Sequence, residues 1–155
     1  MPENVEIERR FLVDGRFERP WVHESTACIE IKQWYLDHKK FNLSIEHNAV
    51  MYNNKQLVSG LSEEVCSTLL QEPDWTVRIR KSYSAYFLTL KGSRKGASAA
   101  EFEWEIERET AESVVDDLLY PFVEKKRYLW TNTDGFVWEI DEFESNLAGL
   151  IIAEV

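Results

Sequence analysis

Polar and apolar residues alternate with a period of two along most of this chain. The clearest run is 101–107, in which Glu alternates with Phe, Trp and Ile. Successive side chains of a β-strand point to opposite faces, whereas a helix repeats about every 3.6 residues, so this pattern predicts strands and a mainly β (α+β) protein. Eight segments share the pattern and are rich in β-branched and aromatic residues: 3–13, 28–37, 75–82, 85–92, 100–108, 123–130, 135–143 and 150–155.

Short connections predict that neighbouring strands are antiparallel. Residues 83–85 suffice only for a tight hairpin turn, and 92–96, with a Gly at each end, is typical of a looser hairpin loop. A crossover between parallel strands needs a dozen or more residues, so these pairs must run in opposite directions. A further small hairpin is expected where 50–52 and 56–58 flank two Asn residues.

Two segments have helical spacing instead. The first begins at Thr110, has Val and Leu at helical intervals and is expected to continue to Pro121. The second covers 62–71, with Ser62 as its N-cap and Pro73 as its stop. We expect both helices to cover the sheet.

Composition narrows the class of protein. The chain has 155 residues, enough for one domain with a sizeable core, and 28 Asp and Glu against 18 Lys and Arg give a net charge of -10. The negative electrostatic field of such a chain repels nucleic acid and anionic membranes. The two cysteines, Cys28 and Cys66, have no metal-binding spacing, and no stretch approaches a membrane span. We therefore expect a cytoplasmic protein with no nucleic-acid or membrane partner.

Like charges recur at every second residue of several predicted strands, and so share a strand face. A solvated sheet face explains any one such row. The segregation recurs from strand to strand, however, and like charges in a row repel one another. In a closed barrel of eight strands the interior holds side chains or one small ligand, and these rows would line it. The expected lining has seven acids and six bases: Glu6, Glu8, Glu103, Glu105, Glu139, Asp141, Glu154, Arg10, Arg78, Arg80, Lys91, Lys125 and Arg127.

Such a lining suits a metal together with phosphate. Carboxylates are hard oxygen ligands for Mg²⁺ or Mn²⁺, while Arg and Lys bind phosphate oxygens. The three histidines share no metal spacing, and most Trp residues are expected to pack on the outside of the barrel.

The order of these pieces resembles the CYTH domain, or triphosphate tunnel metalloenzyme, superfamily over essentially the whole chain. The opening Glu6-Ile7-Glu8-Arg9-Arg10 is similar to the E-x-E-x-K start of that family. Further similar motifs follow in order: Gln33-Trp34-Tyr35-Leu36, Val77-Arg78-Ile79-Arg80, Leu88-Thr89-Leu90-Lys91, Glu103-Trp104-Glu105-Ile106, Glu124-Lys125-Lys126-Arg127-Tyr128, Glu139-Ile140-Asp141-Glu142-Phe143, and Leu147-Ala148-Gly149-Leu150 with Ala153-Glu154-Val155.

The resemblance implies an eight-stranded antiparallel closed β-barrel and a metal-dependent hydrolase of triphosphates, with inorganic tripolyphosphate as the first choice of substrate. The expected phosphate-binding residues are Arg10, Arg78, Arg80, Lys91, Lys125 and Arg127. The expected ligands of Mg²⁺ or Mn²⁺ are Glu6, Glu8, Glu105, Asp141 and Glu154. Glu103 and Glu139 are expected to orient water or a lining cation, while Glu101 and Glu107 are left out because they lie toward the ends of their strand.

Alternatives remain open at this point. Adenylyl cyclase or thiamine triphosphatase activity would use the same tunnel, and a non-catalytic (poly)phosphate-binding module would use it without chemistry. Arg10 stands where the family usually has Lys, and the chain ends at Val155 where relatives usually continue with another Glu and a helix. We expect one domain over 1–155, as a monomer or homodimer, whose longer connection 37–74 covers the barrel.

Overall fold

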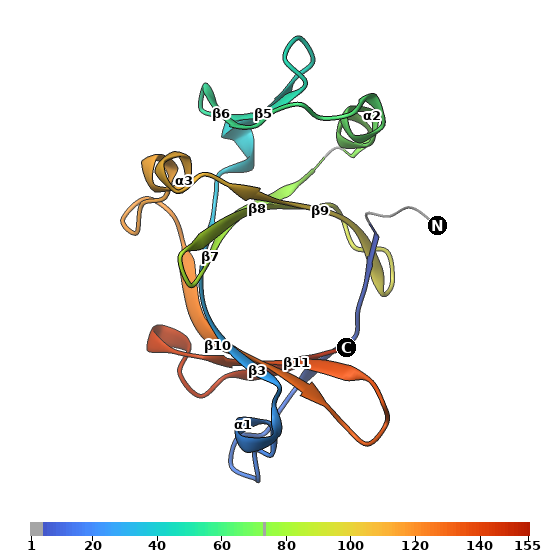
Figure 1. Cartoon of the computed structure of the whole chain (residues 1–155), viewed down its shortest axis with the longest axis vertical. Helices are drawn as coiled ribbons and strands as arrows, with labels where there is room; N and C mark the ends of the chain where they lie inside the picture. Colours follow the sequence, from blue (N-terminus) through green and yellow to red (C-terminus); the bar gives the residue numbers. More distant parts are fainter. Residues whose placement is uncertain (1–4, 73) are drawn as a thin grey trace.

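One strongly curled antiparallel sheet encircles a central space in the computed structural model (Figure 1). The structure describes residues 5–72 and 74–155. Within them the sheet has nine strands in the order β1-β9-β8-β7-β3-β10-β11-β12-β2. Their bounds are β1 Val5–Ile7, β2 Arg10–Leu12, β3 Ala27–Tyr35, β7 Thr76–Ser82, β8 Ala85–Lys91, β9 Ser98–Ile106, β10 Phe122–Thr131, β11 Val137–Phe143 and β12 Ile151–Glu154. The prediction of a mainly antiparallel β fold with a few helices is confirmed.

The prediction of a closed barrel is wrong in one respect, because the two edge strands β1 and β2 do not pair with each other. They are consecutive pieces of one bent strand: β1 pairs with β9 and β2 pairs with β12. The bend lies at Glu8–Arg9, where Arg9 exchanges two backbone hydrogen bonds with Val155, of 2.6 and 2.9 Å. The chain itself thus bridges the gap, and the predicted strand 3–13 becomes two. Residues 3 and 4 lie outside the described residues.

The outer face of the sheet is covered on two sides. A second sheet, β4 (Phe41–Ser44), β5 (Ala49–Tyr52) and β6 (Lys55–Val58), packs with α2 (Glu63–Gln71) and α3 (Arg108–Val114) near β8 and β9 (Figure 1). On the opposite side, the short α1 (Trp21–Glu24) contacts β10 and buries Trp21. The connection 37–74 therefore packs against the outside of the sheet.

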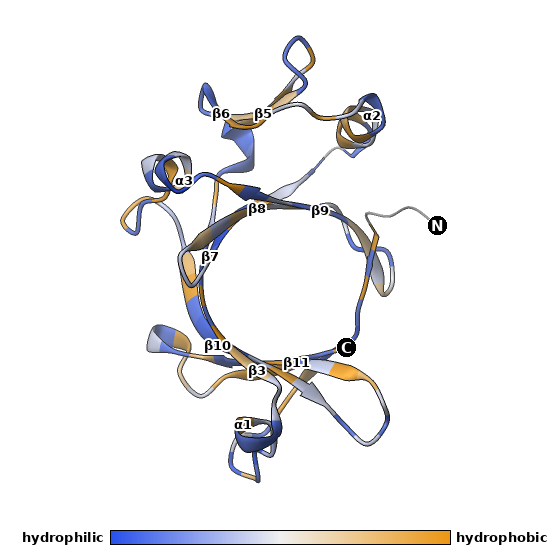
Figure 2. Cartoon of the chain, in the orientation of Figure 1, coloured by the Kyte–Doolittle hydropathy of each residue, from blue (hydrophilic) through white to orange (hydrophobic). Residues whose placement is uncertain are grey.

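Apolar residues of the strands point outward into this cover. Ile79, Leu88 and Leu90 are fully buried there, in one cluster with Tyr52 and Leu69 of the covering layer. Figure 2 shows hydrophobic and hydrophilic residues around α2, the pattern of a helix with one covered face. Because side chains alternate along a strand, burying this row on the outside turns the charged row inward. None of the helices in 5–72 and 74–155 has the length and hydropathy needed to span a bilayer.

The local predictions had mixed outcomes. The small hairpin is confirmed as β5–β6, with Asn53 and Asn54 at positive φ, and Ser62 caps α2 by accepting from Val65 N at 3.2 Å. Pro73 lies outside the described residues.

The prediction of a helix from Thr110 to Pro121 is wrong at both ends. The helix α3 starts earlier, at Arg108, and stops at Val114. Its early end has a local cause: the Asp116 side chain accepts from Leu118 N at 2.8 Å, and such side chain to backbone bonds compete with helix. The strand β4 and the helix α1 were not anticipated from sequence.

Candidate functional site

The space enclosed by the sheet contains a cavity of about 380 Å³ lined mainly by charged side chains. It gathers all the predicted site residues except Glu105. The predicted residues that line it are Glu6, Glu8, Arg10, Arg78, Arg80, Lys91, Glu103, Lys125, Arg127, Glu139, Asp141 and Glu154. It also includes Glu101 and the unpredicted Gln33, Tyr35, Phe143, Leu147, Leu150 and Ile152.

On the acidic strand β9, the residues that line the cavity differ from those that the sequence indicated. Glu101, Glu103 and Glu105 share its inner face, opposite Lys91, Thr89 and Phe87 of β8 respectively. Glu101 lies in the cavity, whereas Glu105 is exposed and outside it, so the assignment of Glu105 to the site is not supported. Burial, followed by the charge of Glu6, raises the pKa of Glu101. Pairing β9 with the Lys91 strand would have revealed Glu101.

One wall of the cavity holds a buried ion cluster around Asp141, which is 2% exposed. Lys125 Nζ lies 2.7 Å from its Oδ2, and Arg127 donates from Nε and Nη2 at 2.8 and 3.0 Å. Burial raises the pKa of Asp141, but the hydrogen bond from Arg127 and the charge of Lys125 outweigh it and lower the pKa overall. Burial lowers the pKa of Lys125. Asp141 thus orients the Lys125 and Arg127 side chains toward the cavity.

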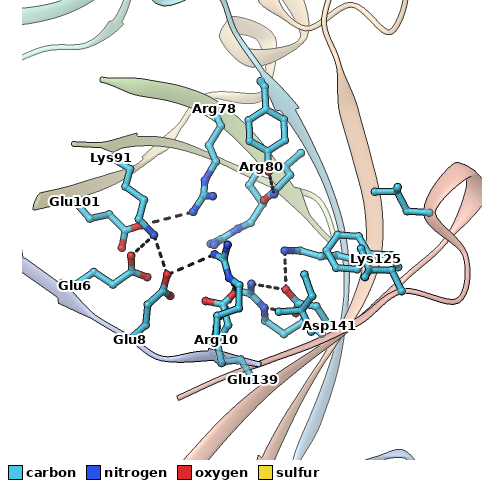
Figure 3. A pocket seen from close by; sticks show the side chains of 18 of the residues that line it. Glu6, Glu8, Arg10, Arg78, Arg80, Lys91, Glu101, Lys125, Glu139 and Asp141 are labelled. Atoms are coloured by element: carbon cyan, nitrogen blue, oxygen red, sulfur yellow. Dashed lines mark hydrogen bonds and ion pairs between the residues drawn. The ribbon is translucent and has the colours of Figure 1, made fainter. Parts of the chain in front are cut away.

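A second wall, built by β1, β2 and β12, brings carboxyl groups together. Lys91 bridges Glu6 and Glu8, with its Nζ 3.2 Å from Glu8 Oε1, as Figure 3 shows. Arg10 lies 3.5 Å from Glu8 and 3.3 Å from Glu154. One strand bend thus delivers two acids and a base to the same place.

The interaction between Glu8 and Glu154 moves the pKa values of the two carboxyls apart. Burial and the bond to Glu8 raise the pKa of Glu154 to about 7. For Glu8 burial acts in the same direction, but the hydrogen bond from the Glu154 carboxyl and the charge of Lys91 lower its pKa to about 2. The two carboxyls therefore differ strongly in their affinity for a proton.

Arg94 also reaches this wall, from the loop between β8 and β9. Its Nη2 pairs with Glu8 Oε1, and its Nη1 donates to Ala97 O at 3.1 Å. The sequence of this segment predicts only a loop. An isolated Arg in a Gly-flanked loop has no periodicity, so only the three-dimensional path of the loop shows that it contacts Glu8.

The third wall, β7, provides donors without acceptors. The buried Nε atoms of Arg78 and Arg80 have no hydrogen-bond partner among the described residues. Arg78 lies 3.6 Å from Glu101, while Arg80 lies 2.7 Å from Glu103 and over the ring of Phe87. Burial lowers the pKa of Arg80. Because buried donors without partners cost free energy, this wall favours an anionic ligand.

The acidic groups fit a divalent cation only jointly with another ligand. Among the described residues, no three acidic, His or Cys side chains are placed to hold a metal. Mg²⁺, however, is usually bound by one or two carboxylates plus phosphate oxygens and water. Metal ligands must be deprotonated, so a cation bound at Glu8 and Glu154 would displace a proton from Glu154, whose pKa is raised. The donor set therefore suits a cation that the ligand helps to bind.

Comparison with named proteins points to the same kind of ligand, a chain of phosphates. No family model matches the chain. It is 39% identical over 85 residues to an inorganic triphosphatase of Acetivibrio thermocellus, covering 54% of each chain. It is 35% identical over 79 residues to an inorganic triphosphatase of Nitrosomonas europaea, covering 51% of this chain and 52% of the relative. The matches thus span about half the length of these relatives.

Solved structures match almost the whole chain. The crystal structure of the inorganic triphosphatase NE1496 matches 97% of this chain and 74% of its own, with 25% identity and a TM-score of 0.53. The chain has the triphosphate tunnel fold. HpAC1 from Hippeastrum, described as a putative adenylyl cyclase with a dominant triphosphatase activity, shares the fold at 14% identity and a TM-score of 0.51. Together these relatives and structures point to the CYTH or triphosphate tunnel family.

Proposed function

We propose that this protein is a metal-dependent triphosphatase whose substrate is inorganic tripolyphosphate. The observation that carries the proposal is the tunnel itself: six cationic side chains face one cavity, and the Nε atoms of Arg78 and Arg80 are buried there without acceptors. A chain of phosphates supplies many anionic oxygens in a narrow, extended shape. The inorganic triphosphatases among its relatives support the same substrate class.

The cations of the tunnel would exchange carboxylate partners for phosphate oxygens. Arg78 and Arg80 contact the phosphates from β7, Lys125 and Arg127 from β10, and Lys91 and Arg10 from the acidic wall. Charge that builds on the leaving phosphate would be stabilised by these fixed donors without reorganisation of water. Asp141 keeps Lys125 and Arg127 aimed at the ligand.

Glu8 and Glu154 are our choice for contact with a divalent cation, with Glu6 and Glu101 beside them. When bound, Mg²⁺ or Mn²⁺ would neutralise negative charge on the phosphate chain as a Lewis acid. Glu103 and Glu139 pair with Arg80 at 2.7 Å and Arg127 at 3.3 Å, and are only partly buried. We assign them to holding these arginines and orienting water.

Phosphate release tests this function. The protein should release phosphate from tripolyphosphate with Mg²⁺ or Mn²⁺, and excess chelator should abolish the release. Glu8→Gln and Arg80→Ala should each lower kcat/KM by about 10- to 100-fold, because each removes a charge-assisted contact of roughly 1.5–3 kcal/mol at the reacting groups. Lys126→Ala is the matched control, since Lys126 is on the same strand as Lys125 but outside the cavity lining.

The outcome separates the classes of function. Full release in the presence of chelator would contradict metal dependence. Tight binding of tripolyphosphate without release would instead support a non-catalytic phosphate-binding module. Faster turnover of thiamine triphosphate, or formation of cyclic AMP from ATP, would replace the proposed substrate.

A further inference from the structure

The outer cover of the sheet has a cavity of its own, of about 200 Å³, which the function proposed above does not use. It lies where the β5–β6 hairpin meets the end of α3 and the connection that follows that helix (Figure 1). The short 3₁₀ helix η1 (His38–Lys40) contributes one side chain to it. None of its lining residues lines the tunnel, so the two cavities are separate.

Two lysines reach this cavity without an acidic partner. Lys55 Nζ donates to Ser113 O at 2.9 Å, which uses one of the hydrogens of its ammonium group. Lys40 is half-buried, and its Nζ lies 5.9 Å from the centre of the Tyr120 ring. Neither lysine forms an ion pair within 5–72 and 74–155. Both therefore retain hydrogens for a ligand.

A buried tyrosine pair supplies a further donor, which carries no charge. Tyr52 is 2% exposed and Tyr120 is 8% exposed. The hydroxyl of Tyr52 accepts from Asp37 N at 3.0 Å and donates to Tyr120 Oη at 2.9 Å. Because the Tyr120 oxygen accepts this hydrogen, it must direct its own hydrogen elsewhere. No acceptor for that hydrogen is found in the part of the chain that the structure describes, so it is available to a ligand in the cavity.

One acid faces these donors. Asp116 lines the cavity, and its Oδ1 accepts from Leu118 N at 2.8 Å. Two lysines against one aspartate give the lining a net charge of +1, in a chain whose total is -10. A carboxylate can only accept hydrogen bonds, so an anion beside it must carry a hydrogen of its own. The cavity therefore suits a small anion that retains a proton.

We propose that this cavity is a second anion site, outside the tunnel, and that it binds orthophosphate. Lys40, Lys55 and the hydroxyl of Tyr120 donate to phosphate oxygens, and Asp116 accepts from the oxygen that keeps a proton at neutral pH. Sulfate has a similar size and shape but keeps no proton at neutral pH, so the Asp116 carboxylate should repel it. Bound orthophosphate would join η1, the hairpin and the connection after α3, which are far apart in sequence.

The tunnel also suits anions, so the test must locate the bound orthophosphate. In the Arg80→Ala variant, whose tunnel is weakened, proton–nitrogen NMR should show that orthophosphate shifts the backbone amides of Asn53 and Lys55. Adding Lys40→Met should raise the Kd measured on these amides about tenfold, because it removes a charged donor. Lys39→Met is the matched control, since Lys39 precedes Lys40 on η1, is exposed and does not line the cavity. It should leave the Kd unchanged.

Two more variants test the chemistry of the site on the same amides. The wild-type site should prefer orthophosphate to sulfate about tenfold, and Asp116→Asn should remove this preference, because an amide can donate to sulfate. Tyr120→Phe should raise the Kd for orthophosphate severalfold. Thermal melting controls for its effect on the fold, since the buried Tyr52 hydroxyl then loses its acceptor.

Two results would overturn the site. One is orthophosphate shifts confined to the amides of tunnel strands, and the other is an equal Kd for Lys40→Met and Lys39→Met. Equal binding of sulfate and orthophosphate by the wild type would contradict the assignment of Asp116 and the choice of orthophosphate. Binding at this cavity does not require turnover in the tunnel, so a protein without triphosphatase activity would contradict only the proposed function.

Discussion

Glu101 and Glu105 share one face of one strand, yet only Glu101 lies in the cavity. We predict that Glu101→Gln lowers kcat/KM for tripolyphosphate at least about tenfold, because it removes the partner of Arg78 and one negative charge beside Glu6. Glu105→Gln, the same chemical change four residues along, should leave it within about twofold. Phosphate-release kinetics measure both. A larger loss from Glu105→Gln would restore the assignment made from sequence.

Arg94 pairs with Glu8, which we assign to the divalent cation. Replacing Arg94 should therefore change the affinity for that cation. Lys91 and Arg10 also contact Glu8, and the proposed function assigns both to the phosphates. Arg94 lies outside the cavity lining and can remain on Glu8. Outer partners of metal ligands commonly contribute 10- to 100-fold in metal affinity. We predict that Arg94→Ala raises the Mg²⁺ concentration for half-maximal activity about tenfold.

The control for Arg94 is its neighbour. Lys95→Ala removes the same charge from the same exposed loop and should leave the Mg²⁺ requirement unchanged. Direct titration with Mn²⁺, followed by its paramagnetic signal with a non-hydrolysable triphosphate analogue present, should show the same difference. Tighter Mn²⁺ binding by Arg94→Ala would mean that Arg94 competes with the cation instead.

At the scale of elements, the connection after α3 is fastened to β3 by one carboxylate. Asp117 accepts from Lys32 Nζ and from Trp34 Nε1, each at 2.7 Å. The hydrogen bond from Lys32, followed by that from Trp34, lowers the pKa of Asp117. A carboxyl with a lower pKa in the folded state stabilises the fold above its unfolded pKa of 3.8 and loses this contribution as pH falls through the folded value.

We predict that Asp117→Asn lowers the free energy of unfolding at pH 7 by less than about 1 kcal/mol, because Asp117 is 51% exposed and solvent screens the pair. Urea unfolding of both proteins at pH 7 and near pH 3 measures the effect. The difference between wild type and variant should shrink at the lower pH. A difference that stays constant would show that charge on Asp117 is not its source.

At the scale of the whole molecule, segregation of charge gives an acidic chain a tunnel that suits an anion. The lining has six bases and seven acids, so 6 − 7 gives a charge of only -1, and the remainder of the total of -10 lies elsewhere on the chain. Near balance keeps the charges of the tunnel paired in the absence of ligand, since an unpaired buried charge costs several kcal/mol. A ligand that exchanges with these pairs should tie the strands of the sheet together.

We predict that tripolyphosphate at 100 times its Kd stabilises the protein by about 2.7 kcal/mol and raises Tm by roughly 5–10 °C. Orthophosphate at the same concentration should raise Tm far less, since it spans fewer of the cations. Differential scanning calorimetry over a range of salt measures the shift, which should decrease as salt rises. Equal shifts for the two anions would contradict a site shaped for a phosphate chain.

The alternation of residues determined the strands and the face that each side chain would take. It works because pleating is local: a residue and its second neighbour share a face whatever the strand pairs with. For this reason the inward direction of Arg78, Arg80, Lys125 and Arg127 could be predicted. The turn at Asn53-Asn54 and the Ser62 cap were predictable on the same local grounds.

Tertiary structure alone decided the position of each residue along the tunnel. Sliding a strand by two residues leaves every side chain on its face, so alternation cannot distinguish Glu101 from Glu105, and only pairing with the Lys91 strand does. The bend that makes the first strand serve both edges of the sheet depends on contacts with Ala97 and Val155, far away in the sequence. Long-range pairing likewise brought Arg94 to Glu8 and Tyr35 to Arg78, because neither contact follows from any local repeat.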